Sequence, residues 1–103
     1  MDKDRVREVV EYLEHSLHEN GIAPAEVVLF GSRNGGTPHE ESDVELIIVS
    51  KAFENKDILE RSEMVASSKL AVIRKFLAPL DVIFLTPDEF EEDPTYASMV
   101  ATP

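Results

Sequence analysis

Three acidic side chains at the starts of two predicted strands are the residues of this chain best suited to chemistry. Asp43 and Glu45 stand two positions apart before an apolar run at residues 46–49, and Asp81 is the second residue of L-D-V-I-F-L. Side chains two positions apart on a strand point to the same face, so Asp43 and Glu45 are neighbours. Neighbouring carboxylates repel each other, which is unfavourable for stability but suits the binding of a divalent cation.

A glycine and a serine follow the apolar run that precedes these acids. Residues 27–30 (VVLF) stop at Gly31-Ser32, and Arg33 opens a polar stretch that contains two further glycines. Glycine lets the backbone approach a ligand closely, and the N–H groups at a helix start favour anions. The pattern fits a phosphate contact beside the acids, whereas Gly-Ser taken alone is more typical of an ordinary turn.

The remaining elements follow from apolar spacing and turn chemistry. We expect a helix over residues 4–19, a strand at 26–30 that is central in its sheet, and a second strand at 43–49. A long helix is expected over residues 56–76 with a weaker middle at 66–69, then a third strand at 80–85. Thr86-Pro87 begins a short helix, and residues 91–103 form a polar tail.

This order of elements brings the acids together. A helix between the second and third strands makes a β–α–β unit, whose strands are parallel and therefore start at the same end of the sheet. If the first strand runs antiparallel to the second, Gly31-Ser32 arrives at that same edge. The alternative is that Asp43, Glu45 and Asp81 are separate, solvent-facing acids at strand ends.

Composition bounds the class of protein. The chain has 103 residues, a net charge of −11 and no cysteine, and we expect one domain over residues 1–103. Ten Lys and Arg residues without a basic cluster make direct nucleic-acid binding unfavourable, while an acidic surface suits a basic protein partner. We see no apolar run of membrane-spanning length and no signal-peptide core, and we expect a cytoplasmic protein.

Gly31-Ser32, ten intervening residues, Asp43-x-Glu45 and the later Asp81 together resemble the signature of the nucleotidyltransferase superfamily in its minimal branch. The resemblance covers nearly the whole chain and departs at Glu45, where most of the family has Asp. It implies an α/β (α+β) nucleotidyltransferase fold, with a small mixed sheet flanked by helices.

The resemblance also implies roles for individual residues. Asp43, Glu45 and Asp81 would hold two Mg²⁺ ions, with Asp81 alternatively serving as base, and Gly31, Ser32 and Arg33 would contact the nucleotide phosphates. ATP would be the substrate, and AMP would pass to an acceptor hydroxyl, such as a Tyr of a HEPN-type toxin that this protein neutralises. Lys51 and Arg74 are weaker candidates for contacts with the triphosphate.

Two other functions remain open at this point. The chain could neutralise a partner by binding alone, because the extra methylene of Glu45 moves its carboxylate by about 1.5 Å and Mg²⁺ requires near-ideal octahedral geometry. It could also modify an antibiotic or another small molecule, although such transferases usually add a substrate domain. A homo-oligomer is a further expectation, with Tyr96, Met99 and Val100 of the tail packing on a second chain.

Overall fold

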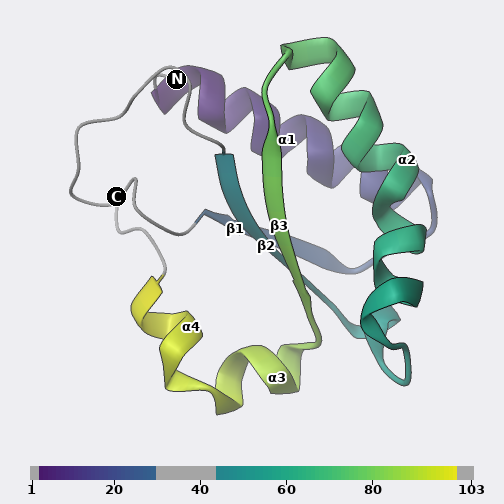
Figure 1. The fold of residues 1–103 in the computed structure, drawn as a ribbon, viewed down its shortest axis with the longest axis vertical. Coiled ribbons are helices and arrows are strands. Elements are labelled where there is room, and N and C mark those ends of the chain that lie inside the picture. Colours follow the sequence, from purple (N-terminus) through teal and green to yellow (C-terminus); the bar gives the residue numbers. More distant parts are fainter. Residues whose placement is uncertain (1–2, 30–43, 100–103) are drawn as a thin grey trace.

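The computed structural model describes residues 3–29 and 44–99. Their elements in chain order are the helix α1 (Lys3–Glu19), the strands β1 (Ala25–Leu29) and β2 (Val44–Ser50), a single 3-10 turn η1 (Lys51–Phe53), the helix α2 (Ile58–Phe76), the strand β3 (Leu80–Leu85) and the helices α3 (Pro87–Glu92) and α4 (Pro94–Met99) (Figure 1). Among the helices in these two ranges, none combines the length and the apolarity that a membrane crossing requires.

The described strands form one mixed sheet in the order β1-β2-β3. β1 pairs antiparallel with β2, and β2 pairs parallel with β3, which confirms the predicted β–α–β unit. The expectation that the first strand is central is wrong: in the described sheet β2 is central and β1 lies at an edge. The reason is the crossover through α2, which carries β3 to the side of β2 that β1 leaves free.

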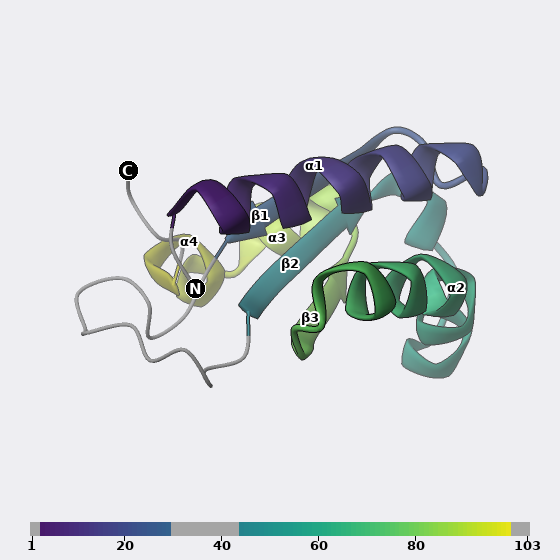
Figure 2. The same cartoon turned by 90° about the horizontal axis from the view of Figure 1, so that it is seen from above.

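The two faces of the sheet have different covers. Val44, Leu46 and Ile48 of β2 belong to the larger core, which they share with buried residues of α1 and α2. These two helices contact each other over that face (Figure 2). Ile47 and Val49 belong to a smaller cluster on the opposite face, where partly buried side chains of α3 and α4 pack.

α1 and α3 form as their sequences predict. The apolar residues of α1 that repeat every three or four positions are buried, namely Val6, Val9, Leu13 and Leu17. Thr86 caps α3, where its hydroxyl accepts from the N–H of Glu89 at 3.2 Å and its own N–H donates to the Glu89 carboxylate at 2.8 Å.

α2 runs without interruption through residues 66–69, where a weaker middle was expected. It starts at a capping box of Asp57 and Glu60. Ser68 is fully buried in this stretch and accepts hydrogen bonds from the Ser16 hydroxyl and the Asn20 amide, each at 3.0 Å. A polar residue in the middle of the helix is therefore a contact to α1 rather than a point of weakness.

The C-terminal segment differs from the expected polar tail. Residues Pro94–Met99 form the helix α4, which was not among the expected elements. Tyr96 is half-buried against the cluster of Ile47, Val49 and Leu85 of its own chain. The side chains of Met99 and Val100 lie outside the described residues, so packing of this segment on a second chain stays a prediction. The burial of apolar surface on the open face of the sheet gives α4 its position.

Candidate active site

Glu45 and Asp81 are paired across the two parallel strands. Their Cα atoms are direct partners in the register of β2 and β3, and each is the second residue of its strand. Neighbouring strands lie about 4.8 Å apart, so the backbone positions that carry these two side chains are adjacent. The predicted meeting of these acids at one end of the sheet is confirmed by the register, while their role remains a prediction.

Both acids point to the face opposite α1 and α2. Along β2 the alternating residues Val44 and Leu46 enter the larger core, which leaves Glu45 on the same side as Ile47. The same alternation along β3 places Asp81 on the side of Ile83. Glu45 is half-buried and Asp81 is exposed, so the pair forms a charged end to an otherwise apolar face.

The helices that cover this face lie toward its other end. α3 begins directly after the end of β3, whereas Asp81 stands at the start of that strand (Figure 1). The side chains that α3 and α4 contribute, Phe90 and Tyr96, pack against the cluster of Ile47, Val49 and Leu85. The two acids are therefore displaced along the strands from the packing of these helices.

The end of β1 lies at the same end of the sheet as the starts of β2 and β3. Leu29, the last residue of β1, pairs with Leu46, and Val44 donates a backbone hydrogen bond to the carbonyl of Pro79 at 3.0 Å. β1 therefore ends, and β2 and β3 begin, at the same end of the sheet, as the topology predicted. The other predicted site residues, Gly31, Ser32, Arg33 and Asp43, lie outside the described residues.

A metal centre would need ligands from that remaining segment. Within residues 3–29 and 44–99, no three His, Asp or Glu side chains come close enough together to hold an ion. Glu45 and Asp81 supply two carboxylates, and Asp43 directly precedes the first residue of β2. Carboxylate oxygens are the donors that Mg²⁺ prefers, so the chemistry of this pair fits that ion.

One of the weaker phosphate candidates is wrongly placed. Lys51 follows the last residue of β2, six residues beyond Glu45, which corresponds to about 20 Å along a strand. A lysine at that distance cannot reach a triphosphate held beside Glu45 and Asp81. Arg74 lies in the last turn of α2, at the end of the helix from which the chain returns to the start of β3.

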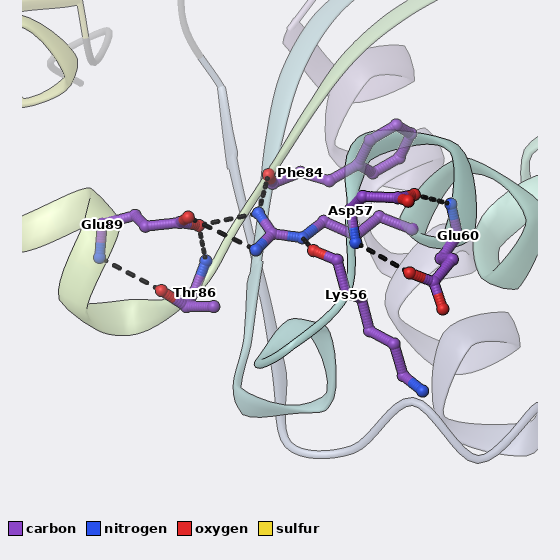
Figure 3. A network of polar contacts seen from close by, with 7 residues as sticks. Lys56, Asp57, Glu60, Phe84, Thr86 and Glu89 are labelled. Atoms are coloured by element: carbon purple, nitrogen blue, oxygen red, sulfur yellow. Dashed lines mark hydrogen bonds and ion pairs between the residues drawn. The ribbon is translucent and has the colours of Figure 1, made fainter.

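A separate polar network joins α2 to α3, and it was not predicted. The Arg61 guanidinium donates to both oxygens of the Glu89 carboxylate, at 2.7 and 3.3 Å, to the Phe84 carbonyl at 3.0 Å and to the Lys56 carbonyl at 2.9 Å. Figure 3 shows its acceptors and the capping pair of Thr86 and Glu89.

This network is structural in character. The hydrogen bond from Arg61 and the backbone N–H of Thr86 hold the pKa of the Glu89 carboxyl below its ordinary value of 4.5. The Arg61 guanidinium uses its donors in four hydrogen bonds that hold neighbouring elements together. The capping pattern Thr86-x-x-Glu89 was readable in sequence, but nothing local identified Arg61 as the partner from α2.

Comparison with known proteins decides the family. Residues 6–101 match the nucleotidyltransferase domain family, and this range contains all six predicted site residues. The chain belongs to that family. Membership supports a role in nucleotidyl transfer, and the mixed sheet with its helices is the nucleotidyltransferase fold.

The solved structures that resemble this chain include two with TM-scores above 0.5. One is a protein of Sulfolobus solfataricus whose name assigns it to the nucleotidyltransferases, with a TM-score of 0.51, 22% identity, and coverage of 89% of this chain and 82% of that chain. The other is the BolA domain of SufE1 from Arabidopsis thaliana, with a TM-score of 0.52, 25% identity, and coverage of 86% and 99%. A comparison with curated proteins found no match.

The resemblance to the BolA domain shows that this topology occurs in proteins with different names. A domain with a different name shares much of this arrangement of helices and strands, so the fold does not by itself select a function. The sequence, and not the topology, therefore decides the family of this nucleotidyltransferase domain.

Proposed function

We propose that this nucleotidyltransferase-family protein transfers a nucleoside monophosphate, specifically AMP from ATP, to an acceptor hydroxyl in a Mg²⁺-dependent reaction. The observation that carries the proposal is the register of Glu45 and Asp81, which places two carboxylates side by side at one strand edge in a domain of this family. Adjacent carboxylates repel each other, and a bound divalent cation would relieve that repulsion.

The proposed roles divide between the acids and the Gly-Ser segment. Asp43, Glu45 and Asp81 would hold Mg²⁺, which would supply Lewis-acid stabilisation of the charge that develops on the phosphate oxygens. Gly31, Ser32 and Arg33 bind and orient the triphosphate. The acceptor oxygen bonds to the α-phosphorus, the bond from that phosphorus to the bridging oxygen of the β-phosphate breaks, and pyrophosphate leaves. In the alternative role, in which it is not a metal ligand, Asp81 takes the proton of the acceptor hydroxyl.

The proposed acceptor is a Tyr hydroxyl on a HEPN-type toxin, which the protein would neutralise as an antitoxin. Support for a basic partner comes from the charge of this chain, which has 21 Asp and Glu against ten Lys and Arg. Opposite net charges raise the rate of encounter between two proteins. The identity of the partner rests on the resemblance described above.

Titration calorimetry with ATP, in the presence and absence of Mg²⁺, tests the site. We expect Mg²⁺-dependent binding by the natural protein, and loss of that binding in Asp43→Asn and Asp81→Asn because each variant removes a metal-binding charge. Asp88→Asn is the matched control, since Asp88 is an exposed acid in the first turn of α3. Binding that does not need Mg²⁺, or that survives both site substitutions, would refute the proposed site.

A second candidate function is neutralisation of a partner by binding alone, which the longer side chain of Glu45 favours. The enzyme and the binding module are distinguished by incubating the protein and a co-purified partner with ATP labelled at its α-phosphate, and by measuring label on the partner. Label on the partner, absent with Asp43→Asn and with the acceptor Tyr→Phe, supports the enzyme. Full neutralisation of the partner by Asp43→Asn without any label supports the binding module instead.

A further inference from the structure

The large apolar side chains that are exposed in the described residues all lie on α2 or at its C-cap. They are Ile58, Leu59, Leu70 and Leu77, with exposed fractions of 74%, 71%, 47% and 87%. Single exposed leucines are ordinary on a protein surface, whereas several on one element make that element a candidate interaction surface.

Three of the exposed positions on α2 align along one side of the helix. At about 100° per residue, Leu59, Ala66 and Leu70 fall within about 40° of one another, and Leu77 follows Leu70 at the end of the helix. We call Leu59, Ala66, Leu70 and Leu77 the α2 stripe. Ser68, which bonds to α1, lies on the opposite side of the helix, so the stripe faces away from α1.

Leu77 is also held in an unfavourable conformation. Its φ of 53° and ψ of 39° are left-handed, a region that suits glycine and disfavours residues with a Cβ. Its side chain is almost fully exposed, so the apolar surface contributes little to the folding of one chain. A leucine at this position is explained if its side chain becomes buried in an assembly.

The α2 stripe is complementary to itself. Leu59 and Leu77 are each nine residues from Ser68, and Ala66 and Leu70 are each two residues from it. A two-fold axis at the level of Ser68 that sets a second α2 antiparallel to the first therefore places Leu59 opposite Leu77 of the second copy. It also places the small Ala66 opposite the large Leu70, and each pairing occurs twice.

Charges on the flank of the stripe match under the same symmetry. Glu63 and Arg74 lie within about 20° of each other around the helix, on one side of the stripe. They stand five residues before and six residues after Ser68, so Glu63 meets Arg74 of the second copy. Neither side chain forms an ion pair within the described part of the chain. Lys69 lies on the other flank at the rim, where solvent and salt screen its charge.

We infer that this protein forms a homodimer in which the α2 stripes of two copies pack antiparallel across a two-fold axis near Ser68. The inference does not depend on the proposed reaction, because Glu45 and Asp81 lie on the face of the sheet opposite α2. One helix from each copy buries a small area, below about 1,200 Å², so the dimer is in the weak class of interfaces.

Sedimentation equilibrium over about 5 to 500 μM protein tests the assembly in this range of affinity. We expect a monomer–dimer equilibrium for the natural protein and a monomer throughout for Leu70→Glu, which places a charge at the centre of the stripe. A protein that is monomeric at every concentration overturns the inference, and so does a dimer that Leu70→Glu leaves unchanged.

A charge exchange tests the antiparallel geometry. Glu63→Arg and Arg74→Glu should each weaken the dimer about tenfold, because each replaces two attractive pairs by two repulsive ones. The double variant should regain the natural dissociation constant, since the pairs are restored with reversed sign. Glu92→Arg on α3 is the control for the change in net charge and should leave the constant within about twofold. Weakening that the double variant does not relieve would overturn the antiparallel register.

Discussion

Leu77 shows how a single residue can oppose the stability of its own fold. It ends α2 in a left-handed conformation, and its N–H donates to the carbonyl of Ile73 at 2.8 Å. Glycine is the usual residue at such a helix end, because a Cβ crowds the adjacent carbonyl there. The backbone satisfies the helix end at a conformational cost that the exposed leucine does not offset within one chain.

Replacing Leu77 by Gly should therefore stabilise the monomer. We expect the free energy of unfolding to rise by about 1 kcal/mol, measured by urea denaturation at low micromolar protein, where a weak dimer is dissociated. Leu77→Ala is the matched control, because it removes the same side chain but keeps the Cβ, and it should give no comparable gain. A lower stability for Leu77→Gly would mean that the leucine packs in the monomer after all.

At the scale of elements, two small polar joints hold the helices in place. Ser68 links α2 to α1 through Ser16 and Asn20, and Asn20 also donates to the Ser16 carbonyl at 2.8 Å. Arg61 links α2 to α3 through Glu89. Both joints place a hydrogen-bonding side chain where hydrophobic packing alone would leave the angle between two elements less well defined.

The joint between α1 and α2 should respond to Ser68→Ala. The substitution removes the acceptor of two hydrogen bonds at a fully buried position, so we expect the free energy of unfolding to fall by about 1 kcal/mol in urea denaturation. The adjacent Ser67 is exposed, and Ser67→Ala should be neutral or slightly stabilising because Ala favours the helix. Equal effects of the two substitutions would show that the buried hydrogen bonds do not contribute.

The joint between α2 and α3 should depend on pH. The pKa of Glu89 is lowered in the folded protein, so its ionised form stabilises the fold above the ordinary value of 4.5, and this contribution is lost as the pH falls through the lowered pKa. Glu89→Gln should reduce the free energy of unfolding by about 1 kcal/mol at pH 7. The difference from the natural protein should shrink below pH 4.5.

Urea denaturation across that pH range measures the difference. Glu91→Gln, on the same helix and exposed, is the control and should change little at either end of the range. A Glu89→Gln difference that stays constant down to acid pH would show that the carboxylate charge is not what stabilises the joint.

At the scale of the whole molecule, one face of the sheet builds the larger core and the other carries the proposed active site. α1 and α2 build the larger core on one face, while the other face carries the acidic pair at one end and the packing of α3 and α4 at the other. Over the chain as a whole, 21 Asp and Glu stand against ten Lys and Arg, which gives the net charge of −11. Self-repulsion of this magnitude destabilises the compact state.

Salt should therefore stabilise the protein. Raising NaCl from about 20 to about 500 mM shortens the Debye length several-fold and should raise the melting temperature by a few degrees in a calorimetric scan. A double variant Glu91→Gln with Glu92→Gln carries two fewer negative charges and should respond less to the same salt. A melting temperature that falls with salt would indicate that attractive pairs outweigh the net repulsion.

Local patterns in the sequence determined much of this structure. The spacing of Val6, Val9, Leu13 and Leu17 identified α1, the run from residue 80 to 85 matched β3, and Thr86 marked the start of α3. The β–α–β rule then placed the acids of both strand starts at the same end of the sheet, and the register added that Glu45 is the direct partner of Asp81. These features follow from periodicity, capping and connectivity, which act over short stretches of chain.

Only the tertiary structure decided the features that depend on packing between distant segments. It put β1 at the edge of the described sheet and turned the acids away from α1 and α2. It also folded α4 against the open face and joined Arg61 to Glu89, 28 residues away. A local pattern states which side of an element is apolar, whereas the element that covers this side is chosen by the free energy of the whole assembled core.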